Sequence, residues 1–225
     1  MNRISVVFGT RPEAIKLAPV VKALRLAGTF EVRVCVTAQH RQMLDQVLEL
    51  FAITPEVDLD LMQPGQDLTD LTVRVLAGMR EVLRDWRPDL VLVQGDTTTT
   101  FAASLAAHYE KIALGHVEAG LRTGSIYAPW PEEMNRRLTT VLAALHFAPT
   151  PWARDNLVQE GIPEDCIHLT GNTVIDALFE VVARLQSDGP LRAALEQRFG
   201  FLDPARKFWS GLRADLPDTT SLGGI

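Results

Sequence analysis

Short apolar runs that end at glycine-containing polar loops constrain the fold of this chain more than any other feature. The run at residues 90–93 leads into Gly-Asp-Thr-Thr, and the run at 112–117 leads into Glu-Ala-Gly-Leu-Arg. An apolar run of this length, bounded by glycine, is typical of a strand buried in a parallel sheet. Similar runs alternate with helical patterns from residue 4 to about residue 170, with short connections. This alternation predicts an α/β fold with a doubly wound parallel sheet.

Acidic side chains lie just beyond two of these runs. Asp96 and Glu118 each follow a run, and Glu132 opens the next predicted helix. Ligands of open α/β sheets bind beyond the carboxyl ends of the strands, so we expect the three acids to converge on one rim. Carboxyls whose pKa values are separated by burial and repulsion can act as general acid and base. Two other interpretations stay open: acids that only cap helices, and a Mg²⁺ site. The motifs that contain these acids show no Asp-x-Asp pair, so we predict no metal.

A second group of residues suits a phosphate. The loop at residues 9–11 lies between a predicted strand and the start of a predicted helix, where backbone amides favour an anion. Arg11 and Lys16 add positive charge there, and Arg122 and Arg136 are further candidates for neutralising a diphosphate. Neither a P-loop nor a G-x-G-x-x-G fingerprint is present, which indicates neither ATP nor NAD. An ordinary capped turn with solvated charges is the alternative.

Composition narrows the class of protein. The net charge of −6 argues against nucleic acid or an anionic membrane surface as the main partner. A membrane span needs roughly 18 consecutive apolar residues, which the sequence does not contain. Cys35 and Cys166 are far apart and lack metal-ligand spacing, which favours two reduced thiols. The first residues do not form a signal peptide, so a cytoplasmic enzyme is predicted.

Five motifs give the chain its resemblance to a known family. They are FGTRPEAIK (residues 8–16), TAQHR (37–41), GDTTTT (95–100), GHVEAGLRT (115–123) and PEEMNR (131–136). Over about residues 3–207 the chain resembles the non-hydrolysing UDP-N-acetylglucosamine 2-epimerases. The resemblance implies a Rossmann-like half of a glycosyltransferase-B type fold, no cofactor, and a homodimer for full-length relatives. It also implies reversible conversion of UDP-GlcNAc to UDP-ManNAc for bacterial surface polysaccharide synthesis.

The resemblance also implies a mechanism and a set of residues. UDP would leave C1, a carboxylate would remove the C2 hydrogen to give 2-acetamidoglucal, and UDP would add back after protonation on the other face. By motif, the acid–base candidates are Asp96, Glu118 and Glu132. The residues expected around the substrate are Arg11, Lys16 and Arg136. The residues expected to line a second site, where UDP-GlcNAc acts as allosteric activator, are Gln39, His40 and Gln42. From spacing alone, these last three equally fit a capped helix start.

The C-terminal part departs from the family pattern. Residues 1–170 are expected to form the Rossmann-like domain, 171–207 a linker with helices leading to a largely missing second domain, and 208–225 a disordered tail unlike the family. The chain is therefore expected to be a truncated form whose own turnover is in question. A non-catalytic UDP-sugar-binding fragment that needs a partner domain is the main alternative. A UDP-sugar glycosyltransferase and a hydrolysing epimerase are further alternatives.

Overall fold

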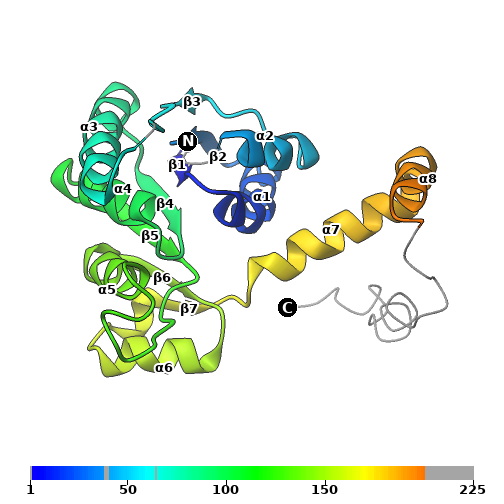
Figure 1. Ribbon diagram of the computed structural model, residues 1–225. Helices are drawn as coiled ribbons and strands as arrows, with labels where there is room; N and C mark the ends of the chain where they lie inside the picture. Colours follow the sequence, from blue (N-terminus) through cyan, green and yellow to red (C-terminus); the bar gives the residue numbers. More distant parts are fainter. Residues whose placement is uncertain (1, 38–40, 64, 201–225) are drawn as a thin grey trace. The chain divides into compact units, whose positions relative to one another are not determined.

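The computed structural model describes residues 2–37, 41–63 and 65–200, with the side chains of 41 and 42 also outside the description (Figure 1). The chain divides into two compact units, Met1–Leu178 and Phe179–Ile225. The first unit holds the sheet. The described part of the second unit consists of the end of helix α7 and helix α8. The domain bounds at residues 170 and 207 stay predictions.

The first unit is built on a parallel sheet of seven strands in the order β3-β2-β1-β4-β5-β6-β7. The strands are β1 Asn2–Phe8, β2 Phe30–Val36, β3 Val57–Asp58, β4 Leu90–Gln94, β5 Ala113–Val117, β6 Leu145–Ala148 and β7 Ile167–Leu169. Every neighbouring pair in the sheet is parallel. The strand order reverses between β1 and β4, which is where an open α/β sheet binds its ligands. The predicted doubly wound parallel sheet is confirmed.

Helices connect the strands. They are α1 Arg11–Leu26, α2 Arg41–Leu50, α3 Leu68–Trp86, α4 Thr98–Tyr109, α5 Glu132–Leu142, α6 Pro151–Gln159, α7 Thr173–Ser187 and α8 Gly189–Arg198, with a short 3₁₀ turn at Glu164–Cys166. Parallel crossovers are right-handed, so α1, which leads toward the β2 side, and α4, which leads toward the β5 side, cover opposite faces of the sheet. Within the described residues, none of these helices has both the length and the apolar composition to cross a membrane.

Burial explains why β1, β4 and β5 hold the centre of the sheet. Val7 of β1, Val91 of β4 and Leu114 of β5 are almost fully buried and pack with apolar residues of α3 and α4. On the other face α1 buries Leu17 and Val21 at the sheet. Strands covered on both faces read as unbroken apolar runs, which is the pattern seen in the sequence. Their carboxyl ends therefore form a fixed rim on which polar side chains can be held.

Candidate functional site

The rim at the carboxyl ends of β1, β4 and β5 collects most of the charged residues that the sequence singled out. Glu118 lies directly after β5 with its backbone in the left-handed region, at φ 64°. Its Oε2 accepts a hydrogen bond from Lys16 Nζ at 2.6 Å and another from the Gln94 side-chain amide. Its Oε1 accepts a longer bond from Asn172 Nδ2, at 3.4 Å. The structure thus pairs Lys16, which was predicted to bind the substrate, with Glu118, which was predicted to act as an acid or base.

Asp96 is held in a similar way from α5. Its carboxylate accepts a hydrogen bond from Arg136, and its backbone carbonyl accepts one from Asn135 Nδ2 at 2.9 Å. Arg136 also donates through Nη1 to Glu133 Oε2, at 3.2 Å. The side chain of Asp96 keeps 27% of its surface exposed. Asp96 is therefore paired with a cation and still accessible to a ligand.

Glu132 and Glu133 have different environments although they are adjacent. Glu133 is fully buried and binds Arg136, Arg137 Nε at 3.1 Å and the Thr123 backbone amide at 3.2 Å. Glu132 is half-buried at the first position of α5, and within the described part of the chain it has no hydrogen-bond partner. The expected convergence of three acids thus appears as two cation-bound acids, Asp96 and Glu118, and a third without a partner. The catalytic role of all three stays a prediction.

Glu13 is a rim residue whose role sequence reasoning missed. It is 2% exposed, and its side chain accepts four hydrogen bonds. Oε2 accepts from the amides of Gly9 and Thr10, at 2.9 and 2.7 Å. Oε1 accepts from the hydroxyls of Thr97 and Thr100, at 2.6 and 3.0 Å. Glu13 therefore ties the loop after β1 to the loop that carries Asp96. A glutamate at the third helical position, after a threonine cap, was the available signal.

Arg11 and Arg122, two of the cations predicted to bind a diphosphate, have different surroundings in the structure. Arg11 is exposed at the first position of α1 and, among the described residues, has no ion-pair partner. Arg122, by contrast, is only 7% exposed and makes a two-pronged pair with Glu160, with both N–O distances 2.7 Å. It also donates to Thr140 Oγ1 at 2.9 Å. This hydrogen bonding holds the pKa of Glu160 below its ordinary value. Arg122 is thus used in packing α6 rather than kept for a diphosphate.

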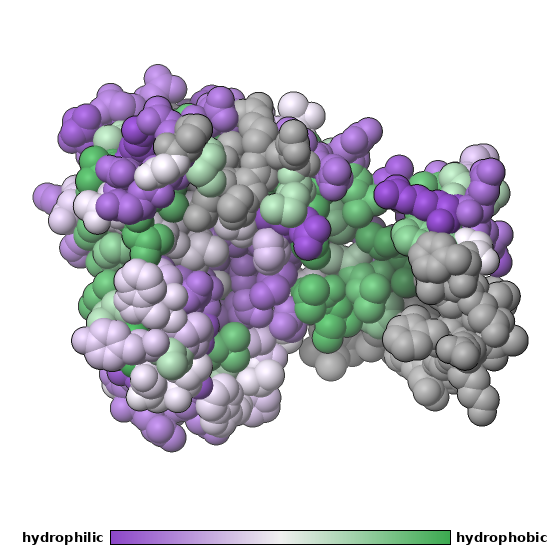
Figure 2. Space-filling model, in the orientation of Figure 1, coloured by the Kyte–Doolittle hydropathy of each residue, from purple (hydrophilic) through white to green (hydrophobic). Residues whose placement is uncertain are grey.

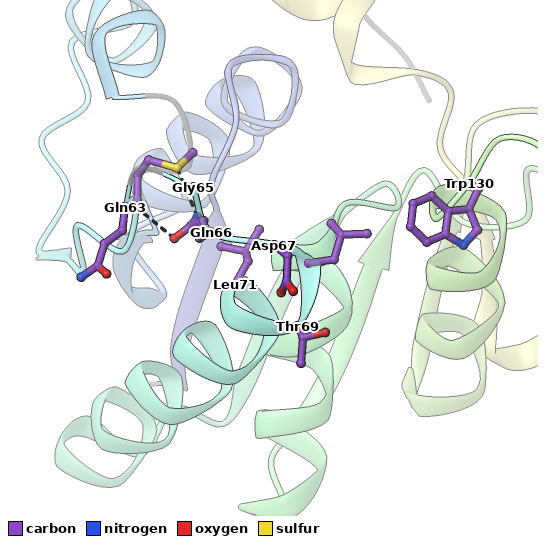
Figure 3. Close-up of a pocket in the computed structure, with 9 residues that line it drawn as sticks. Gln63, Gly65, Gln66, Asp67, Thr69, Leu71 and Trp130 are labelled. Atoms are coloured by element: carbon purple, nitrogen blue, oxygen red, sulfur yellow. Dashed lines mark hydrogen bonds between the residues drawn. The ribbon is translucent and has the colours of Figure 1, made fainter.

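The residues assigned to an allosteric site are mostly beyond the description. Gln39 and His40 lie outside the described residues, and Gln42 is described only as part of the α2 backbone. A cavity of about 880 Å³ is lined by Met62, Gln63, Gly65, Gln66, Asp67, Leu68, Thr69, Leu71 and Trp130. Figure 3 shows Trp130 on the far side of this cavity from the segment that begins at Gln63. The Leu61 amide donates to the Thr37 carbonyl at 3.1 Å, so this segment leaves the sheet next to Thr37.

The rim combines cations that can bind an anion with carboxylates that can exchange a proton. Within the described residues, no cluster of three or more His, Cys, Asp or Glu side chains is arranged to hold a metal. Lys16 has three N–H donors and only one is used by Glu118, so it can also reach a phosphate oxygen. Carboxylates beside cations, at the strand-order reversal of a parallel sheet, suit acid–base chemistry on a phosphorylated ligand.

Several known proteins are similar to this chain in fold and in sequence. A UDP-N-acetylglucosamine 2-epimerase from Yersinia pestis is 60% identical over 205 residues, which is 91% of this chain and 54% of that protein. The crystal structure of the Neisseria meningitidis UDP-GlcNAc 2-epimerase bound to UDP-GlcNAc matches with a TM-score of 0.86 and 54% identity, over 89% of this chain and 54% of that one. The Methanocaldococcus jannaschii UDP-GlcNAc 2-epimerase, in complex with UDP-GlcNAc and UDP, matches with a TM-score of 0.80 and 35% identity, over 87% and 53%.

The chain thus spans about half the length of the curated relatives it matches. Its sheet is a Rossmann-like half of the glycosyltransferase-B type fold, as the resemblance implied. The family model described as UDP-N-acetylglucosamine 2-epimerase matches residues 22–202, which contain the Asp96, Glu118 and Arg136 rim. With most of its length covered by that model, the chain belongs to the UDP-N-acetylglucosamine 2-epimerase family.

Proposed function

We propose that this chain carries the acid–base part of a non-hydrolysing UDP-GlcNAc 2-epimerase, which interconverts UDP-GlcNAc and UDP-ManNAc. One observation supports this above the others. The rim pairs each of two acids with a cation, Glu118 with Lys16 and Asp96 with Arg136. Epimerisation by elimination needs both kinds of group, because a proton leaves carbon while a diphosphate leaves and must be retained.

The proposed reaction balances with these groups alone. The C1–O bond breaks, its electron pair leaves with UDP, and positive charge develops at C1. A carboxylate takes the C2 hydrogen as a proton, and the C–H pair forms the double bond of 2-acetamidoglucal. Protonation of C2 on the opposite face and return of UDP to C1 give the other epimer. Asp96, Glu118 and Glu132 are the proposed acid–base groups, and Arg11, Lys16 and Arg136 the proposed diphosphate ligands. Bound UDP remains beside the glucal, which favours re-addition.

Solvent exchange tests the proposal. The purified chain is incubated with UDP-GlcNAc in deuterated water and followed by proton NMR. We expect deuterium at C2 in both epimers, and no free ManNAc. Asp96→Asn and Glu118→Gln should each slow exchange by about 10²-fold or more, the range for loss of a general acid or base. Glu81→Gln is the control, because Glu81 is an exposed residue paired with Arg80. No exchange by a chain shown to be folded by circular dichroism would refute catalysis by this chain.

A second candidate function is a non-catalytic UDP-sugar-binding fragment that needs a partner domain. The chain covers only about half of its relatives' length. Figure 2 shows a hydrophobic patch over α7, where Val174, Ile175, Leu178 and Phe179 are exposed. Calorimetric titration with UDP-GlcNAc separates the two candidates. Binding without C2 exchange favours the fragment, and exchange favours the enzyme.

Two proposals concern partners. UDP-GlcNAc also acts as an allosteric activator through Gln39, His40 and Gln42, and the 880 Å³ cavity lined by Met62, Gln66 and Trp130, among others, provides space for a ligand. A homodimer forms through α5, whose exposed apolar residues Met134, Leu138 and Val141 lie at i, i+4 and i+7 on one face. Sedimentation of Val141→Lys tests the dimer. Leu26→Lys, at an exposed position of α1, is the control. A cytoplasmic location remains a prediction from the sequence.

A further inference from the structure

The loop that carries Asp96 rests on a buried histidine ring of the neighbouring strand. His116 lies on β5, and its side chain has no exposed surface. Its Nε2 lies 2.6 Å from the carbonyl oxygen of Gly95, the residue before Asp96. A carbonyl oxygen only accepts hydrogen bonds, so Nε2 must carry the hydrogen. We infer that His116 is a positioning residue, which holds the Asp96 loop (residues 95–97) in the geometry that the proposed epimerase reaction requires.

Both backbone polar groups of Gly95 are bound by β5. Its amide donates to the Val117 carbonyl at 3.0 Å, and its carbonyl accepts from the His116 ring. Gly95 has φ 73°, in the left-handed region, so the chain turns sharply here before Asp96. The next residue is about 3.8 Å away along the chain, so a displaced Gly95 carries Asp96 with it. The Asp96 carboxylate would then move relative to Arg136 and to a bound sugar.

His116 cannot serve as an acid or base itself. Burial is the main cause that lowers its pKa to about 3; the hydrogen bond to the Gly95 carbonyl opposes this shift, and the nearby His146, Arg122 and Arg136 add to it. The ring therefore stays neutral at every pH at which an enzyme of this kind is assayed, with one fixed tautomer. Its Nδ1 is buried and has no hydrogen-bond partner among the described residues. The ring acts on the reaction only through Gly95, and this inference rests on the proposed function.

The chain offers a matched set of variants. His116→Gln keeps an N–H that can reach the Gly95 carbonyl, whereas His116→Phe fills the space without a donor. His146→Phe is the control. His146 is the register neighbour of His116 on β6, is 1% exposed, and burial lowers its pKa too. Among the described residues, no hydrogen bond joins His146 to the Asp96 loop. A general loss of packing should therefore affect His116→Phe and His146→Phe alike.

Two measurements decide the matter, and the first needs no activity. In ¹⁵N-labelled protein we expect His116→Phe to shift the amide signals of Gly95 and Asp96, His116→Gln to shift them less, and His146→Phe least. In C2 exchange we expect His116→Phe to lower kcat by about 100-fold with KM changed by less than about 3-fold, the effect of a misplaced catalytic group. His116→Gln should recover most of kcat.

The outcomes separate the two ideas. If the wild-type chain shows no exchange, the proposed function fails, and the amide shifts still decide the role of His116. If His116→Phe moves the Gly95 and Asp96 signals no more than His146→Phe does, the inference is overturned. It is also overturned if the wild type exchanges and His116→Phe matches His146→Phe in kcat.

Discussion

Replacing Glu13 by alanine tests whether this buried carboxylate holds two loops together. The substitution removes four hydrogen bonds at once. The two threonine hydroxyls keep other partners, since Thr100 Oγ1 lies 2.7 Å from the Gln94 carbonyl and 3.1 Å from Thr97 Oγ1. The amides of Gly9 and Thr10 lose their acceptor, and Gly9 is buried. The cost therefore comes mainly from two unpaired backbone donors.

The magnitude follows from those two donors. A buried polar group left without a partner costs about 1–3 kcal/mol, so two of them cost about 2–6 kcal/mol. Thr10 is only half-buried and can reach water, so we expect a loss of about 3 kcal/mol in the free energy of unfolding. For a chain of this size that corresponds to a Tm lower by roughly 6–12 °C. Urea unfolding followed by circular dichroism measures the difference.

Two further variants show whether the reasoning is right. Glu13→Gln keeps an amide oxygen for the two backbone donors, and the threonine hydroxyls can rotate to accept from its N–H, so we expect about 1 kcal/mol. Glu81→Ala removes an exposed carboxylate paired with Arg80, and such a pair is worth about 0–1 kcal/mol. A Glu13→Ala chain that loses no more stability than Glu81→Ala would refute the account of Glu13 as the residue that joins these loops.

Three other predictions concern backbone and burial. Gly120→Ala should lower the free energy of unfolding by about 3 kcal/mol, because φ is 87° and a Cβ would lie 2.1 Å from the Ala153 carbonyl oxygen. Gly124→Ala is the control in the same urea assay: its φ is 82° but the space around it is open, so the loss should be about 1 kcal/mol. Glu118→Gly should be more stable than Glu118→Ala by about 1 kcal/mol, since both lose the carboxylate and only glycine accepts φ 64° without strain; equal stability would contradict this. The free energy of unfolding of the wild type relative to His116→Phe should fall as pH drops from 6.5 toward 3. The reason is that His116 becomes protonated in the unfolded chain over this range, whereas the buried ring of the folded chain stays neutral; urea unfolding at several pH values measures this.

The fold was predictable because its signals are local and repeated. Apolar runs ending at Gly95 and at the loop containing Gly120 mark strands that are covered on both faces, and short connections leave only a parallel, right-handed arrangement. Once the strands are parallel, their carboxyl ends must share one rim. Asp96 and Glu118 could therefore be assigned to that rim from the sequence alone.

The partner of each charge could not be predicted, because it depends on contacts between distant segments. Arg122 and Arg136 looked equivalent as diphosphate ligands. Packing of α6 brings Glu160, 38 positions away, against Arg122, while Arg136 reaches Asp96. Glu132 and Glu133 pose the same problem within one helix. Successive residues point roughly 100° apart, so the two acids have different surroundings, and the pattern of acids does not indicate which of them faces inward.

At Glu118 the backbone conformation favours glycine, whereas the proposed function requires a carboxylate. At φ 64° the backbone favours glycine, and a carboxylate there carries a strain of about 1–2 kcal/mol. Such strain persists only where the surroundings over-determine the conformation. Here the next residue is fixed by the Ala119 amide bonded to the Phe147 carbonyl at 3.0 Å, and the side chain by Lys16 and Gln94. A glycine would adopt the conformation of this turn without strain and would suit the stability of the fold. A glutamate at this position is accounted for by the need for a carboxylate beside Lys16 at the rim, which is what the proposed proton transfer requires.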